Sequence, residues 1–99
     1  MIKIKVTKND ITVLGHAMYD DYGKDIVCAA VSSVITTAVE IAASFDASSV
    51  DIFEENDKLE IIINKHDEIT ERIINTMLEL LRNLEEQYPK NIKITNKEE

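Results

Sequence analysis

The stretch Ile26–Ser44, IVCAAVSSVITTAVEIAAS, decides the fold of this 99-residue chain. Its apolar residues recur at helical spacing, and Asp25 just before it has the chemistry of a helix N-cap. Between residues 26 and 45 the only charged side chain is Glu40. A helix that is apolar almost all round must be covered on several faces. We therefore expect it to pack on a sheet, on a second helix and against another subunit. The stripe predicted to face the core is Val27, Val31, Val34, Ala38 and Ile41.

Alternating sequences flank this helix on both sides. Before it, residues 2–6 alternate apolar and polar, and the turn residues Asn9-Asp10 lead to a second short strand over residues 11–14. After it, residues 50–53 and 59–63 read as two strands around a polar turn. Each pair of neighbouring strands is therefore predicted to form a hairpin.

The last third of the chain predicts one more helix and one more strand. Asp67 or Thr70 can cap an amphipathic helix that runs to about Glu86. Residues 92–95 then alternate again as a short strand, and residues 96–99 are expected to be a frayed tail.

The element order is thus ββαββαβ. Hairpins joined by helices indicate an α+β fold with a mostly antiparallel sheet and two helices packed on it. No linker or low-complexity segment interrupts the chain, so residues 1–99 are expected to form a single domain.

The chain carries 19 acidic and 11 basic residues, a net charge of −8. This charge disfavours nonspecific binding to nucleic acid or to an anionic membrane, so neither is expected as a partner. It suits a basic partner, such as a protein segment rich in lysine and arginine. The alternative interpretation is that the acidity only confers solubility.

The single cysteine excludes an internal disulfide and a metal site built from several cysteines. No apolar stretch of about 18 residues lacks a charge, so no membrane span is expected. The alternating N-terminus lacks the apolar core of a signal peptide. Together these features predict a cytoplasmic protein.

The residues with catalytic chemistry gather between Gly15 and Cys28. His16 ends a predicted strand, and Cys28 lies at about the third position of the helix if Asp25 is the cap. Unsatisfied N–H groups at a helix start favour a thiolate and can also form an oxyanion hole. A histidine placed nearby can take the thiol proton. Cys28 and His16 are therefore a candidate nucleophile–base pair.

A structural interpretation competes with this pair. A lone cysteine in an apolar helix is more often a small core residue, and a histidine beside a glycine is more often a turn or surface group. Asp25 is more often a simple cap, and its negative charge would oppose a thiolate at Cys28. It would be more useful as an orienter of His16. On these residues alone, the core-cysteine interpretation is favoured.

The stretch Gly15–Ser32, GHAMYDDYGKDIVCAAVS, resembles the signature of the ribosomal-processing cysteine protease family (Prp). The matching elements are the Gly-His-Ala opening, the Tyr-Gly-x-Asp-Ile-Val-Cys-Ala core and the serine four residues after the cysteine. The signature covers about a fifth of the chain, and the length and element order agree over nearly all of it.

The resemblance implies a bacterial, cytoplasmic and homodimeric cysteine endopeptidase without metal or cofactor. It would remove the N-terminal extension of ribosomal large-subunit protein twenty-seven. By the same resemblance Cys28 is the nucleophile, His16 the general base, and Gly15, Asp25 and Ser32 have supporting roles. Ser32 lies one helical turn after Cys28 and can share its face, or it can bond back to a helix carbonyl.

Residues 16–23 are predicted to be a loop that gates a peptide substrate. Gly15 and Gly23 would be its hinges, and its aromatic and acidic side chains would contact substrate. The alternative is a merely solvated loop. The second histidine, His66, is interpreted as a surface or turn residue. The side chains assigned to substrate contact are Tyr19, Asp20, Asp21 and Tyr22.

Two other functions remain open on the sequence. The first is a non-enzymatic acidic homodimer that binds a basic ribosomal protein, with Cys28 in its core. The second is a thiol redox sensor, although the chain has no second cysteine to resolve an oxidised thiol.

Overall fold

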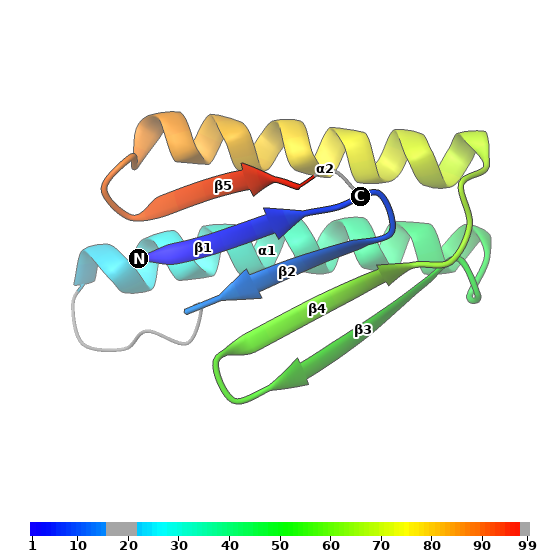
Figure 1. The fold of residues 1–99 in the computed structure, drawn as a ribbon, viewed down its shortest axis with the longest axis horizontal. Coiled ribbons are helices and arrows are strands. Elements are labelled where there is room, and N and C mark those ends of the chain that lie inside the picture. Colours follow the sequence, from blue (N-terminus) through cyan, green and yellow to red (C-terminus); the bar gives the residue numbers. More distant parts are fainter. Residues whose placement is uncertain (16–21, 98–99) are drawn as a thin grey trace.

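The computed structural model describes residues 1–15 and 22–97, apart from the side chains of residues 22–25. Within that part the elements follow the predicted order ββαββαβ (Figure 1). The elements are β1 (Ile2–Val6), β2 (Asp10–Leu14), α1 (Tyr22–Phe45), β3 (Val50–Glu55), β4 (Lys58–Ile63), α2 (Glu68–Gln87) and β5 (Ile92–Asn96).

The described strands form one sheet in the order β3-β4-β2-β1-β5. The pairs β1/β2, β2/β4 and β3/β4 are antiparallel, and β1/β5 is parallel. Both helices lie behind the sheet in Figure 1, and they contact each other. The predicted α+β fold with a mostly antiparallel sheet is confirmed.

The hydrophobic core fills the space between the sheet and the helices. In β1, Ile2 and Ile4 are buried, while the alternating Lys3 and Lys5 are exposed, so one face of the sheet is open to solvent. Period-two alternation produces this split because successive side chains of a strand point to opposite faces. The core residues that are almost completely buried include Ile4, Ile11, Val13, Val27, Val31, Ile61, Met77, Leu81 and Ile92.

Helix α1 begins earlier than the sequence predicts. It starts at Tyr22, so Asp25 is its fourth residue and not its N-cap. Tyr22 and Gly23, predicted to lie in the loop, belong to the helix, and the hinge role of Gly23 stays a prediction. The sequence places the start too late because Asp25 resembles an N-cap, although acidic residues are also favoured within the first turn of a helix. Packing of an apolar face usually decides helix ends more strongly than propensity does.

The exposed face of α1 is unusually apolar. Ile41, predicted to face the core, is 44% exposed, whereas Ile35 and Ala42 are buried. The segment Ile26–Phe45 is long and apolar enough to cross a membrane by length and composition, and 39% of it is buried here. One such helix is weak support for a membrane span because the core helices of soluble proteins pass the same test.

The structure defines where α2 begins and where β5 ends, two boundaries that the sequence predicts only approximately. The carboxylate of Asp67 accepts the N–H of Thr70 at 2.9 Å, so Asp67 is the N-cap of α2. The predicted frayed tail begins later than expected, because β5 includes Asn96 and the N–H of Lys97 donates to the carbonyl of Val6 at 2.7 Å.

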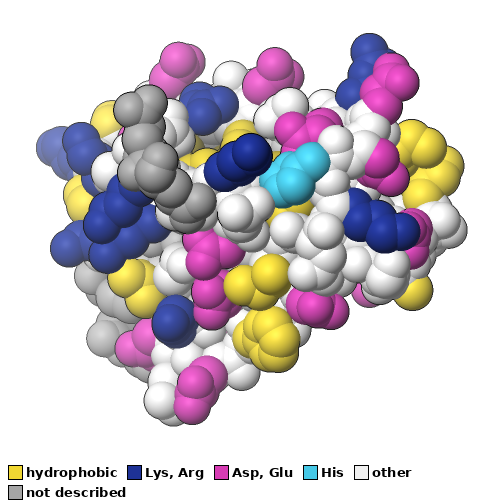
Figure 2. All heavy atoms as spheres, turned by 45° about the vertical axis from the view of Figure 1, so that its right-hand side comes forward, with side chains coloured by type: hydrophobic (Ala, Val, Ile, Leu, Met, Phe, Trp, Pro, Cys, Tyr) yellow, Lys and Arg dark blue, Asp and Glu magenta, His cyan; other side chains and the backbone are white. Residues whose placement is uncertain are grey.

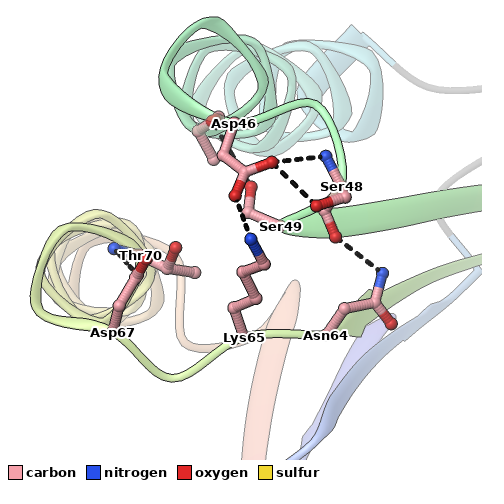
Figure 3. A network of polar contacts seen from close by, with 8 residues as sticks. Asp46, Ser48, Ser49, Asn64, Lys65, Asp67 and Thr70 are labelled. Carbon is pink, nitrogen blue, oxygen red and sulfur yellow. Dashed lines mark hydrogen bonds and ion pairs between the residues drawn. The ribbon is translucent and has the colours of Figure 1, made fainter.

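A polar joint connects the end of α1 to the segment between β4 and α2 (Figure 3). The carboxylate of Asp46 accepts the backbone N–H of Ser48 at 3.0 Å and its hydroxyl at 2.7 Å, and it pairs with the ammonium of Lys65. Asn64 donates from Nδ2 to the carbonyl of Ser48 at 3.2 Å. The hydrogen bond from Lys65, with those from Ser48, lowers the pKa of Asp46 to about 2.

Candidate active site

Cys28, the only cysteine of the chain, lies in the second turn of α1. It is the seventh residue of the helix, so the predicted position near N3 is wrong. Its side chain is 9% exposed and belongs to the hydrophobic core cluster together with Val27 and Val31. The thiol therefore lies at the margin of the core, where both the catalytic and the structural interpretation place a cysteine.

The later position changes the electrostatic argument for Cys28. The field of a helix N-terminus falls off within the first turn, and its unsatisfied N–H groups belong to that turn. The start of α1 thus does not supply the activation or the oxyanion hole expected from a cysteine at N3. A catalytic role of this thiol would therefore require a neighbouring base.

Gly15 directly follows β2 and lies beside the turn between β3 and β4. Its φ is +76°, a conformation that disfavours any side chain, and a Cβ there would lie 2.9 Å from the carbonyl oxygen of Met1. Its N–H donates to the carbonyl of Asp57 at 3.0 Å. Glycine is therefore required where the chain leaves β2 toward His16.

Most of the predicted loop residues cannot be compared with the structure. His16, Tyr19, Asp20 and Asp21 lie outside the described residues, as do the side chains of Tyr22 and Asp25. The contact between His16 and Cys28 stays a prediction.

The second histidine lies at the other end of the sheet. His66 Nδ1 is 2.7 Å from Glu71 Oε2, and His66 Nε2 is 2.8 Å from Asn9 Oδ1. Asn9 precedes β2 and Gly15 follows it, so His66 and Gly15 are separated by the length of that strand. Its position agrees with the prediction of a surface residue.

A cavity of about 120 Å³ lies between α1 and the β3–β4 hairpin. Ser32, one helical turn after Cys28, lines it, and its side chain is exposed. Among the described residues, two other serine hydroxyls bond to carbonyls of α1: that of Ser44 to Ile41 at 2.6 Å and that of Ser49 to Ala42 at 3.3 Å. The cavity wall comprises Val13, Val31, Ile35, Ile52 and Leu59, with Thr36 and Glu54 as further polar members.

The sequence did not single out Ile52 and Glu54 as parts of a site. The strand that contains them mixes acidic and apolar residues, which is the one sequence feature that could have indicated a site. A strand pattern does not reveal which helix the strand faces. The site thus consists of the Cys28 thiol and, one helical turn further along α1, a mainly apolar cavity that can accept a side chain. In the described part of the chain, no group of three His, Cys, Asp or Glu side chains could hold a metal ion.

The sequence model of the family described as "Cysteine protease Prp" matches residues 1–93. The ribosomal processing cysteine protease Prp of Staphylococcus aureus (strain Mu50) is 32% identical over 107 residues, covering 98% of this chain and 100% of that protein.

Two solved structures have the same fold as this chain over nearly its whole length. A crystal structure of Prp from S. aureus in complex with a substrate peptide has a TM-score of 0.89 at 28% identity, covering 98% of this chain and 100% of the other. A second structure of that protein, with a covalently linked product peptide, has a TM-score of 0.85 at 29% identity and the same coverage.

Proposed function

The chain belongs to the cysteine protease Prp family, and we propose that it is an endopeptidase that removes the N-terminal extension of ribosomal large-subunit protein twenty-seven. We assign Cys28 as its nucleophile and His16 as its general base. The observation that carries the proposal is that a member of a cysteine protease family contains one cysteine, Cys28. The covalently linked product peptide in the S. aureus relative supports a mechanism through an acyl-enzyme.

The arrangement of His66 supports the assignment of His16. The chain has two histidines, and both ring nitrogens of His66 already face oxygen atoms of Glu71 and Asn9 at the far end of β2. His16 directly follows Gly15, whose backbone is fixed beside the β3–β4 turn. Of the two histidines, His16 is therefore the better candidate for the base.

The proposed reaction has two halves. His16 takes the proton of Cys28 as the sulfur attacks the scissile carbonyl carbon, and the peptide C–N bond breaks as the imidazolium protonates the leaving amine. This leaves the N-terminal fragment as a thioester on Cys28. His16 then removes a proton from water, which attacks the thioester. The C–S bond breaks, and the sulfur recovers a proton as the carboxylate product leaves.

Cleavage of a synthetic peptide that spans the extension and the first residues of the mature ribosomal protein tests this proposal. Cys28→Ala and His16→Ala should each abolish cleavage while the circular dichroism spectrum stays that of the wild type. His66→Ala is the matched control and should keep cleaving. Undiminished turnover in either of the first two variants would refute the assigned mechanism.

The burial of Cys28 favours a second candidate, an acidic binding module with a core cysteine. Alkylation by iodoacetamide separates the two functions. A nucleophile activated by His16 should be labelled quickly in the wild type and much more slowly in His16→Ala. A core cysteine should be labelled slowly in both, and the ribosomal peptide should then bind without being cut.

We also propose that the protein is a homodimer in the bacterial cytoplasm that binds no nucleic acid directly. The apolar outer face of α1 supports the dimer, because Ile26 and Ile41 are 58% and 44% exposed. The net charge of −8 supports the absence of nucleic acid binding. Light scattering at micromolar concentration should give twice the monomer mass, and Ile41→Glu should lower it. A wild-type monomer would contradict the dimer.

A further inference from the structure

Strand β3 forms one edge of the sheet, with β4 as its single strand neighbour among the described residues. The N–H of Asn64 donates to the carbonyl of Ser49 at 2.8 Å, so these two residues form a hydrogen-bonded pair. Such pairs alternate along an antiparallel ladder. Asp51, Phe53 and Glu55 consequently bond to β4, whereas the backbone N–H of Ile52 points outward from the sheet.

The side chains of β3 are unusual for a sheet edge. Ile52 and Phe53 are 43% and 57% exposed. Residues 50–57 also carry four carboxylates and no cation: Asp51, Glu54, Glu55 and Asp57. Elsewhere, on the face shown in Figure 2, cationic and acidic side chains are intermingled. Proteins usually protect an edge with lysine, proline, a bulge or a covering element, because an open edge pairs with other chains.

The opposite edge strand, β5, is protected by a side chain of the helix that covers it. The carboxylate of Glu85, from α2, accepts the backbone N–H of Ile94 at 2.9 Å. A side chain of the covering helix thus occupies an N–H that an incoming strand would need. Within the described part of the chain the two edges of the sheet therefore differ, because no strand pairs with β3 on its outer side.

Charge decides what can pair with β3. If two copies of the chain paired through this edge, the carboxylates of one strand would lie beside those of the other, and like charges on neighbouring strands are destabilising. A strand with lysine or arginine side chains would instead meet opposite charges. Ile52 and Phe53 are both exposed but point to opposite faces of the sheet, and Ile52, on the side of the cavity, favours an apolar side chain beside it.

Strand β3 also leads directly to the candidate active site. The turn after it holds the carbonyl of Asp57, which accepts the N–H of Gly15 at 3.0 Å. Ile52 and Ser32 line the same cavity, and Ser32 follows Cys28 by one helical turn. A strand added to β3 would send every second side chain toward the helix-facing side, where this cavity lies.

We propose that the free edge of β3 is a docking strand that binds a basic, extended peptide segment by β-strand addition, with an apolar side chain of that segment at the α1/β3 cavity. Main-chain hydrogen bonds supply affinity in this mode and side-chain pockets supply selectivity. The proposal rests on the proposed protease function and names how its substrate is held.

Hydrogen exchange measured by NMR on the Cys28→Ala protein tests the docking without cleavage. The probe is the peptide acetyl-Lys-Val-Lys-Val-Lys-Val-Lys-amide, and the control peptide has glutamate in place of each lysine. The basic peptide should slow exchange of the Ile52 N–H by about tenfold or more and leave that of Phe53, already bonded to β4, nearly unchanged. Equal slowing by the acidic peptide, or no slowing at Ile52, would overturn the proposal.

Two substitutions at Ile52 distinguish the contribution of its backbone N–H to peptide binding from that of its side chain. Ile52→Pro removes the outward N–H, which an edge strand tolerates, and should weaken binding of the basic peptide by about tenfold. Ile52→Ala keeps the N–H and should weaken binding less. Equal affinity in Ile52→Pro and the wild type would contradict strand addition.

A second variant keeps the test valid if Ile52→Pro does not fold. Asp51→Asn combined with Glu55→Gln should lower affinity for the basic peptide and reduce its dependence on salt. Unchanged affinity and salt dependence would contradict charge selection. Because all binding is measured in Cys28→Ala, failure of the wild type to cleave the ribosomal peptide would refute the protease and not the docking strand.

Discussion

Gly15 is a residue whose replacement should be costly although it contributes no side chain. Its φ is +76°, and the carbonyl oxygen of Met1 would lie 2.9 Å from a Cβ at this position. Gly15→Ala should therefore lower the free energy of unfolding by about 1–3 kcal/mol, the cost of a strained backbone. It should also lower the rate of peptide cleavage, since the turn anchors the segment that begins with His16. Urea denaturation and the cleavage assay measure both effects.

The chain's other glycine provides the control for this prediction. Gly23 is the second residue of α1, where alanine is the better helix former. Gly23→Ala should leave the free energy of unfolding unchanged or raise it by up to about 1 kcal/mol. Equal destabilisation by both substitutions would show that the special conformation of Gly15 is not the cause.

At the level of single residues, the sequence predicted which residues belong to the site better than it predicted their positions in the fold. The motif pointed to Gly15, Cys28 and Ser32, and the structure gives Gly15 a left-handed backbone and Ser32 a place at a cavity. The position of Cys28 within its helix was wrong because Asp25 looked like a cap. A carboxylate near a helix start is an ambiguous signal, since acidic residues are favoured both at the cap and throughout the first turn.

At the level of elements, the two neighbouring leucines of α2 offer a matched comparison. Leu81 is completely buried, whereas Leu80 is 46% exposed beside the groove between α1 and α2. Leu81→Ala should lower the free energy of unfolding by about 3 kcal/mol, because it removes buried methyl groups and leaves a cavity. Leu80→Ala should cost less than about 1 kcal/mol. Denaturation curves at the same protein concentration check the difference, and equal losses would contradict the assigned burial.

All seven elements were predictable because each one carries a strong local pattern. The alternation of Ile2, Lys3 and Ile4 identifies β1, and the two candidate caps Asp67 and Thr70 indicate the start of α2, where the structure selects Asp67. The buried face of α1 was less accurate, since Ile41 is exposed. On a helix that is apolar almost all round, periodicity cannot distinguish the face on the sheet from the face toward solvent.

At the level of the whole molecule, the hairpins followed from the sequence but the order of the strands did not. Placing β2 beside β4 joins segments separated by almost half of the chain, and placing β5 beside β1 joins its two ends. Local alternation contains no information on such partners. The two sheet edges, and with them the difference between an open β3 and a protected β5, therefore became visible only in the fold.

The polar joint of Figure 3 links stability of the whole molecule to pH, because it ties the end of α1 to the start of α2. The pKa of Asp46 falls from 3.8 to about 2, mainly through the hydrogen bond from Lys65, and the side-chain and backbone hydrogen bonds of Thr70 lower the pKa of Asp67. A carboxyl group whose pKa is lower in the folded state stabilises the fold above its unfolded-state pKa. That contribution should be lost as the pH falls from about 4 to 2.

Asp46→Asn should therefore flatten the dependence of the melting temperature on pH between about 5 and 2, and lower the melting temperature itself at neutral pH. Both groups of the Asp46–Lys65 pair are exposed, so the effect should also shrink in high salt. Glu86→Gln, on the exposed side of α2, removes one carboxylate elsewhere and serves as the control. If Asp46→Asn keeps the full acid dependence of the wild type, the joint does not cause it. The acid sensitivity would then have to come from carboxylates outside the connection between the helices.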